Sequence, residues 1–440
     1  MKEISSCIGF ISLLILTHLA EAQSPRDSLA NSVSLKQCIQ YAIAHQPLVQ
    51  QSLVDQKIVE STIKSKLADW YPQVTLAYNL QNNFQLPSAN FAGSVVHTGS
   101  YNTSTAGIQA TQNIFNRDVL LASHTAQDVR TQAKQLTEAD KIAITVSVTQ
   151  AFYAVLLTEK QITLTEEDIK RLQRSLKDAY AQYQAGVVDK IDYKRATISL
   201  NNAAAQKNGQ QDSLKAKLSS LKLAMGYPNS ALLQLQFDST QLQKELYIDT
   251  AQQVNYDNRV EYRLMQTQKK LLLQNVRYNK LAYFPTISAF GAYNFNYFNS
   301  GLSKLYNQNY PTSYAGLQLS LPIFQGFKRV ENIKGAELQV QRYEYNLGGY
   351  KDTINNQYQQ ALAAYKSNLY NYGILNENLQ LANEVYNTLE LQYKAGVKTY
   401  LDVITAEEAL RNAEIGYTNA LYQVLASKIN VQKALGIVEY

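Results

Sequence analysis

The chain has 440 residues, of which 41 are basic, 35 are acidic and 32 are tyrosine. Charged residues make up only 17% of it and form no dense Lys/Arg block, so we expect no nucleic-acid partner. The length allows two or three ordinary domains, and the tyrosine-rich, weakly charged composition is typical of outer-membrane and surface proteins.

The N-terminus has the pattern of a secretory signal peptide. Lys2 precedes an apolar run over residues 8–16, and Ala20-Glu21-Ala22 supplies the small residues of a cleavage site. We therefore expect residues 1–22 to be removed, which would leave Cys38 as the only cysteine and exclude an intrachain disulfide. No later segment approaches the roughly 18–20 apolar residues that a membrane helix requires, so membrane entry would need a closed β-barrel.

The first half of the remaining chain alternates helical and strand patterns. Apolar residues alternate with small or polar ones from residue 74 to 80 and again from 108 to 114, which predicts two strands. Between residues 119 and 184, apolar spacings of three and four predict one helix of roughly 100 Å with a coiled-coil seam. In chain order we expect a helix over about 35–68, a strand from 74, an exposed loop over 81–102, a strand over about 108–114, a helix over about 119–184 and a returning helix that ends at Gly226.

The same succession of patterns then begins again. The seam residues of the second long helix lie 210 residues after those of the first. The chain is therefore predicted to be a tandem repeat, with residues 23–226 as the first unit, 227–250 as a connector and 251–440 as the second unit. In the second unit we expect a helix over about 251–282, a strand from 287, a loop over 296–312, a strand over about 317–321, a helix over about 328–395 and a final helix that ends at Gly436.

A short turn joins the last two helices of each repeat. Residues 183–192 recur at 393–402 with Tyr, Ala, Gly, Val and Asp in the same places. Gly186 and Gly396 can take the left-handed conformation that ends a helix, so each turn is predicted to be the tip of a helical hairpin. The residues suited to cap the helices that follow are Asp189 and Thr399.

Four strands are too few to close a barrel, because about eight is the practical minimum. Open strand edges are not tolerated in lipid, where no water satisfies their backbone groups. We therefore expect a homotrimer, in which twelve strands would contact outer membrane lipid. Long helices with narrow seams would line a tunnel beneath the pore, so the pattern indicates a conduit.

The duplicated strand–strand–long-helix unit, the paired tips and the segment Leu317-Gln318-Leu319-Ser320-Leu321-Pro322-Ile323-Phe324 resemble TolC-type outer membrane efflux proteins. The resemblance covers essentially the whole mature chain. One departure is that the first repeat has Asn113-Ile114-Phe115 where the second has Pro322-Ile323-Phe324, so its proline is absent.

The resemblance implies a fold that is mainly α with β. Each protomer would give four β-strands to a trimeric 12-stranded barrel and long helices to a periplasmic α-barrel. It also implies a function: a trimeric exit duct without a cofactor, which exports small molecules together with a periplasmic adaptor (a membrane fusion protein). The third component would be an inner-membrane transporter, such as a resistance-nodulation-division pump. The alternative within this class is a duct for type I protein secretion.

In this family the periplasmic end is closed by polar links between neighbouring hairpins. By position, Asp192 and Tyr393 match a linked pair, and Lys398 stands where well-known members have arginine. Asp402 matches an acidic residue of the aperture, whereas Thr405 replaces a second one. A Lys398–Asp192 link would be looser than one with arginine, since lysine lacks the forked donors. The aperture ring would hold three carboxylates in a trimer.

Ordinary structural roles compete with the gate roles. Asp192 and Asp402 could serve only at helix starts, Tyr393 could be seam packing, and Lys398 could be a solvated turn residue. Contacts with the adaptor are expected at the exposed tips. The tip residues concerned are Gly186, Val187, Asp189, Gly396, Val397 and Thr399.

The sequence offers little support for catalysis. His45, His97 and His124 are scattered without metal-ligand spacing, so no metal site is expected. Ser61-Thr62-Ile63-Lys64 matches Ser-x-x-Lys by chance within a helix, and no phosphate-binding glycine loop is present. The transport energy would then come from another protein. Besides the duct, a periplasmic coiled-coil scaffold or adaptor without a pore remains an alternative, and an enzyme is a remote third.

Overall fold

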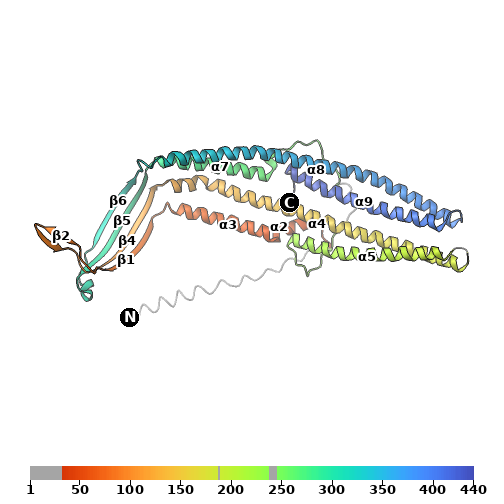
Figure 1. Ribbon diagram of the computed structural model, residues 1–440, viewed down its shortest axis with the longest axis horizontal. Helices are drawn as coiled ribbons and strands as arrows, with labels where there is room; N and C mark the ends of the chain where they lie inside the picture. The colour runs from red at the N-terminus through yellow and green to blue at the C-terminus, as the bar shows by residue number, and fades with distance from the viewer. Residues whose placement is uncertain (1–31, 187–188, 237–244) are drawn as a thin grey trace.

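The computed structural model describes residues 32–186, 189–236 and 245–440. The predicted signal peptide and Val187 lie outside these ranges. The molecule is elongated, with a β-sheet at one end, long helices extending from it, and two hairpin tips at the far end (Figure 1). The helices bend away from the sheet where the strands end.

The two halves contain their main elements in the same order. The first half contains α2 (Leu35–His45), α3 (Pro47–Ala68), β1 (Gln73–Asn82), β4 (Asn102–Phe115), α4 (Arg117–Gln184) and α5 (Lys190–Met225). The second contains α7 (Val260–Lys280), β5 (Thr286–Asn299), β6 (Thr312–Ser320), α8 (Lys328–Lys394) and α9 (Tyr400–Leu435). The predicted strands and long helices are confirmed, while the unit boundaries at 226/227 and 250/251 stay predictions.

The four long strands form one antiparallel sheet in the order β1-β4-β5-β6. Leu76 faces Ile108, and Ile108 faces Tyr293, so these three make a continuous row on one side, where each is at least 45% exposed. The other side is polar: Thr105 donates to Asn296 Oδ1 at 3.1 Å. Within the described chain, the outer edges of β1 and β6 have no strand partner. The sheet therefore has one apolar face, one polar face and two open edges.

The structure corrects several of these expectations. The helix expected over 35–68 breaks at Gln46, because Pro47 lacks an N–H and forces the preceding residue into an extended conformation. The loop over 81–102 contains a hairpin, β2 (Ser88–Phe91) and β3 (Ser94–His97), whose turn residues Ala92 and Gly93 both have positive φ. The helix expected from residue 251 begins at Val260, after the short 3₁₀ turn η1 (Tyr256–Asn258).

The loop expected over 296–312 is partly ordered. Strand β5 continues to Asn299, and the loop then forms the 3₁₀ helix η3 (Leu302–Asn307), which buries Leu305. A second 3₁₀ turn, η2 (Leu281–Tyr283), links α7 to β5.

The main hydrophobic core lies among the helices, midway along the molecule. It includes Val148 and Phe152 of α4, Leu221 of α5 and Val424 of α9. Tyr365 of α8 fastens the connector to this core, because its hydroxyl donates to Leu246 O at 2.8 Å and accepts from the Ile248 N–H at 3.2 Å. The connector is therefore packed against the helices near their middle.

We expected no segment after the signal peptide to be apolar enough for a membrane helix, but one stretch of α4 is. An 18-residue window of α4 is long and apolar enough to cross a bilayer. However, 56% of that window is buried inside the molecule. Its apolar character therefore fits a helix that packs between α2, α5 and α9.

Two glycines, 210 residues apart, end the returning helices at places where backbones approach closely. Gly226 ends α5 with φ +67°, and Gly436 ends α9 with φ +73°. A Cβ at Gly436 would lie 2.7 Å from Asn258 O, and one at Gly226 would lie 2.9 Å from the Cα of Gln46. Each glycine lets a returning helix end against the start of its own repeat.

We expect Gly436→Ala to destabilise the protein more than Gly186→Ala. Gly186 has the same φ of +73°, but no atom of the described residues lies within 4 Å of the place that a Cβ would take, so only the left-handed strain of about 1–2 kcal/mol applies there. At Gly436 the collision with backbone adds roughly 1–3 kcal/mol. Thermal unfolding of the detergent-solubilised full chain, followed by circular dichroism, measures the difference. Equal losses in the two variants would contradict the close-approach argument.

Candidate functional site

The two hairpin tips end α4 and α8 with glycines in the left-handed conformation. Gly186 has φ +73° and Gly396 has φ +77°. At the second tip, the Gly396 N–H donates to Tyr393 O and the Val397 N–H donates to Gln392 O, each at 2.9 Å. This pair of bonds is a Schellman motif, which satisfies the last carbonyls of α8. The tip geometry is thus fixed locally by the glycine.

The helices that leave the tips begin with side-chain caps at the predicted positions. Asp189 accepts a bond from the Ile191 N–H at 3.4 Å. Asp402 accepts from the Thr399 N–H at 3.0 Å and from the Thr399 hydroxyl at 2.8 Å, and these bonds lower the pKa of its carboxyl. Lys398 lowers this pKa further. Asp402 is therefore a charged member of a capping box.

The structure brings some of the predicted gate residues together within one protomer. The Tyr393 hydroxyl donates to Gln182 Oε1 at 2.9 Å, so it bridges α8 to α4. Burial raises the pKa of Tyr393, and the nearby charge of Asp192 raises it further. Among the described residues, neither Asp192 nor Lys398 has an ion-pair partner within 4 Å. The Thr405 hydroxyl donates to Leu401 O at 2.8 Å, within its own helix.

A small apolar cluster joins the two hairpins near their tips. Ala179 of α4, Ala196 of α5, and Tyr400 and Ile404 of α9 are buried against one another, with Tyr393 packed beside them. Ser175 donates to the Tyr400 hydroxyl at 3.0 Å. Tyr393 therefore has a packing role in the protomer, whatever it does between protomers.

Further from the tips, an ionic network joins α4 to α9. Arg171 Nη2 lies 3.4 Å from Asp168 Oδ1 and 3.3 Å from Glu414 Oε2, and its Nε lies 3.7 Å from Glu407 Oε1. Arg411 Nη1 lies 3.5 Å from Asp168 Oδ2. The side chains of Asp168 and Glu407 are 1% and 4% exposed. Three carboxylates thus share two guanidinium groups in a largely buried setting.

The network is not fully satisfied. Arg171 Nε and Glu407 Oε1 are buried and have no hydrogen-bond partner in the part of the chain that the structure describes. Burial raises the pKa of Glu407 to about 7; Asp168 and, less strongly, Glu390 of α8 raise it too, while Arg171 and Arg411 oppose the rise. Because an unpaired buried charge is unfavourable, this carboxyl is the weak point of the contact between the hairpins.

This network was not predicted from the sequence. A signal was present, because Glu407, Arg411 and Glu414 follow one another at spacings of four and three on the helical face that also carries buried Leu410. Charged residues on an apolar stripe indicate a buried ion pair, but the partner helix cannot be read from spacing. The partners Asp168 and Arg171 lie more than 230 residues earlier in the chain.

Known proteins are similar to this chain in sequence and in fold. The signature of the outer membrane efflux protein family matches residues 38–227 and 257–437. The chain belongs to the outer membrane efflux protein family. The outer membrane protein TolC of Escherichia coli is 23% identical over 436 residues, which are 93% of this chain and 83% of TolC. The toluene efflux pump outer membrane protein TtgC of Pseudomonas putida is 22% identical over 412 residues, 92% of this chain and 83% of TtgC.

Solved structures have the same fold. The outer membrane protein VceC of Vibrio cholerae superposes with a TM-score of 0.73 at 15% identity, over 91% of this chain and 96% of VceC. The CmeC outer membrane channel of Campylobacter jejuni superposes with a TM-score of 0.71 at 16% identity, over 91% of this chain and 85% of CmeC. The predicted fold class and family are thereby confirmed. The protein is an outer membrane efflux channel whose helices extend into the periplasm, and a scaffold without a pore no longer fits.

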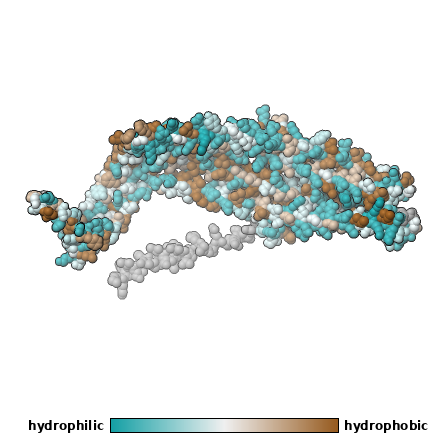
Figure 2. Space-filling view, viewed as in Figure 1, coloured by the Kyte–Doolittle hydropathy of each residue, from teal (hydrophilic) through white to brown (hydrophobic). Residues whose placement is uncertain are grey.

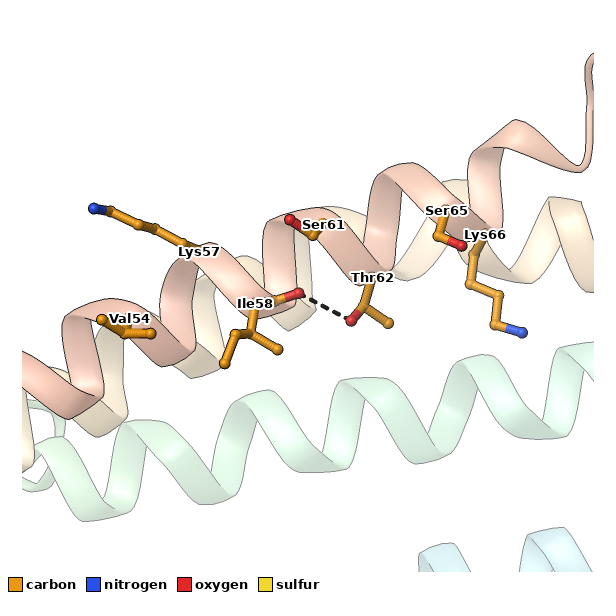
Figure 3. A pocket seen from close by; sticks show the side chains of 7 residues that line it. All are labelled: Val54, Lys57, Ile58, Ser61, Thr62, Ser65 and Lys66. Carbon is orange, nitrogen blue, oxygen red and sulfur yellow. Dashed lines mark hydrogen bonds between the residues drawn. The ribbon is translucent and has the colours of Figure 1, made fainter. Parts of the chain in front are cut away.

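The Ser-x-x-Lys match at residues 61–64 lies on α3, while His45, His97 and His124 lie apart in α2, β3 and α4. Figure 3 shows Ser61 in an open groove with Val54, Ile58 and Thr62, and the Thr62 hydroxyl donates to Ile58 O at 2.9 Å. Lys64 lies 4.0 Å from Glu60 rather than beside Ser61. No group of three or more metal-binding side chains occurs in the described part of the chain. The family consists of channels and not of enzymes.

We expect Glu407→Gln to change how stability depends on pH. An acid whose folded-state pKa is raised holds its proton more tightly in the folded state, so its contribution to stability falls as pH rises from about 4.5 to about 7. The variant should lack this decline and exceed the wild type above pH 7 by up to roughly 3 kcal/mol. Thermal unfolding of the wild type and the variant across pH 4.5–8 measures this difference in stability. The control is Glu408→Gln, an exposed neighbour, and a decline unchanged in Glu407→Gln would contradict the assignment.

Proposed function

We propose that the chain is the exit duct of a tripartite pump. In this proposal three copies assemble into one pore, and the duct acts with a periplasmic adaptor and an inner-membrane transporter such as a resistance-nodulation-division pump. Small molecules then leave the cell through the lumen. The channel itself supplies no energy, and the transporter sets the direction of transport.

The observation that carries the proposal is the pair of open sheet edges. The four-stranded sheet ends in β1 on one side and β6 on the other, and its apolar face is widely exposed. In lipid, unpaired backbone groups are strongly unfavourable, so the edges require strand partners. Because successive strands of the sheet alternate in direction, β1 of one copy would pair antiparallel with β6 of the next, and four strands from each of three copies would give a closed ring of twelve.

A second surface supports assembly with identical copies. On the outward side of α3, Val54 and Ile58 are more than half exposed, and together with Thr62 they line the groove drawn in Figure 3. Apolar side chains in a row on a helix face indicate a contact with another helix. A neighbouring protomer would cover this groove while its strands complete the sheet.

The cargo is inferred from relatives. Two relatives from Pseudomonas putida are named for the efflux of toluene and of antibiotics, and each match spans 92% of this chain and 83% of the relative. The alkaline protease secretion protein AprF of Pseudomonas aeruginosa matches 67% of this chain and 61% of AprF. The wider match favours small molecules over secreted proteins. Dye accumulation and the profile of secreted proteins in cells that lack this chain separate the two cargo classes.

We assign the gate to the tip residues Asp192, Tyr393, Lys398 and Asp402 of neighbouring copies. Lys398 and Asp192 lack ion-pair partners within the described part of one protomer, so both are free to reach a neighbour. Asp402 is held in its capping box and would line the aperture as a charged ring. The exposed tips around Gly186 and Gly396 are assigned to adaptor contacts, because the backbone there is open to solvent.

Cysteines placed on β1 and β6 should cross-link copies into dimers and trimers. Two further strands separate β1 from β6 within a protomer, roughly 14 Å, so a disulfide between them must join two copies. Thr75→Cys is combined with Gln318→Cys or with Ser320→Cys, oxidised in outer membranes and run on non-reducing gels. Native Cys38 should stay silent because burial raises the pKa of its thiol to about 12.

The matched control for this experiment pairs Leu76→Cys with Ile108→Cys, which face each other in β1 and β4. That pair should give only a cross-linked monomer. Monomers alone from every β1–β6 pair would refute the assembly.

Asp192→Ala should raise the conductance of the closed channel several-fold. Removal of this carboxylate deletes the proposed link between neighbouring hairpins, so the tips should separate more readily. Planar-bilayer recordings of the purified full chain measure the closed-state conductance. The control is Asp212→Ala, which removes an exposed carboxylate on the same helix that pairs with Lys215. A closed state with unchanged conductance in Asp192→Ala would refute the gate.

A further inference from the structure

A polar cavity lies where the strands give way to the helices. It has a volume of about 110 Å³, which exceeds the space of a single water molecule and admits a phosphate-sized group. The start of α4, the end of α7 and the start of α8 enclose it. Its polar lining consists of three cationic side chains and three amides, namely Arg117, Lys328, Arg329, Asn279, Gln325 and Asn332.

The positive charge of this cavity is not neutralised from within. None of the described residues that line it carries a carboxylate. Asp118, which follows Arg117 in the chain, accepts a hydrogen bond from the Tyr278 hydroxyl at 2.7 Å. The ring of Tyr278 also stacks against Arg117, whose guanidinium carbon lies 4.5 Å from the ring centroid. Lys328 has no ion-pair partner in the described part of the chain. The cavity is therefore suited to an anion that can accept several hydrogen bonds.

The cationic groups are held in place by neighbouring backbone and rings. Arg329 donates to Ile323 O at 2.9 Å and to Ala282 O at 3.3 Å, and its guanidinium carbon lies 4.7 Å from the Tyr283 ring centroid. A guanidinium group has five N–H donors, so donors remain for a ligand. The fixed guanidinium presents part of a preformed site, while Lys328 supplies a mobile charge.

Aromatic side chains surround the cavity at the same level. Phe324 and Phe327 are 75% and 72% exposed, and their ring centroids lie 5.9 Å apart. Phe284 is also exposed, one residue beyond the 3₁₀ turn that contributes Ala282 to the cavity. Figure 2 shows apolar side chains gathered over the bend where the sheet passes into the helices. Exposed aromatics beside cationic groups are typical of the level of lipid headgroups.

This level faces the periplasmic leaflet. The helices extend into the periplasm, and β4 ends at Phe115, two residues before the cavity-lining Arg117. Lipid phosphates would therefore lie beside the cavity mouth. We infer that the cavity binds the phosphate group of a glycerophospholipid from the periplasmic leaflet and thereby fixes the depth of the channel in the membrane. The lipid is favoured over free phosphate because the aromatic rings around the cavity would contact its acyl chains.

Native mass spectrometry of the detergent-solubilised full chain tests the inference, with phosphatidylglycerol as the probe. We expect Lys328→Gln and Arg117→Gln each to weaken phosphatidylglycerol binding about tenfold, since each removes a charge-assisted hydrogen bond. The matched control is Lys334→Gln, an exposed lysine on the same helix that does not line the cavity. This control should bind like the wild type.

Three outcomes would overturn the inference. Equal binding in all variants would show that the lipid adheres without this cavity. Equal weakening in Lys334→Gln would indicate general charge attraction. Displacement of phosphatidylglycerol by inorganic phosphate at equal concentration would indicate a site for free phosphate. None of these results depends on the cross-linking or conductance experiments, so failure here is distinguishable from failure of the proposed pump function.

Discussion

The structure depends on the requirement that backbone hydrogen-bonding groups be satisfied in lipid. Hydrogen bonds between β1 and β4, β4 and β5, and β5 and β6 meet this requirement inside the sheet, but its two outer edges have no strand partner among the described residues. Its alternation of apolar and polar faces already fits a wall between lipid and water. Because four strands cannot close a barrel, the barrel wall has to be built from several copies of the chain. The helical part must then fit copies arranged around one axis.

The tandem repeat of the chain gives each protomer two similar helical hairpins, which suits an arrangement of copies around one axis. Glycines at matching positions end the long helices at the tips and the returning helices near the middle, so both hairpins have the same lengths. Gly226 and Gly436 let each returning helix end against the start of its own repeat, and the two hairpins extend in the same general direction from the middle of the molecule (Figure 1). The hairpins contact each other through a small apolar cluster near the tips and through the ionic network further from the tips.

Much of this could be predicted from sequence, and the exceptions have physical causes. Periodicity and glycine position predicted the four strands, the long helices and the tip caps, because those features are local. The break at Gln46 was missed although Pro47 signals it, since the apolar pattern continues across the proline. The Asp168–Arg171–Glu407 contact and the basic cavity were out of reach, because each joins segments distant in the chain.

The ionic network and the proposed tip gate act on different contacts. Arg171 and its carboxylates join α4 to α9 within a protomer, so their loss would weaken the contact between the two hairpins of one chain. Asp192 and Lys398 lack such partners inside the described part of the protomer, so in the assembled duct their charges would act between copies. Opening of the tips would then disrupt the links between copies first, because those groups are exposed and solvated, while the buried network keeps each protomer's hairpins together. Because burial raises the pKa of Glu407, its protonation as the pH falls removes an unfavourable buried charge, so the contact between α4 and α9 within a protomer is more stable at lower pH.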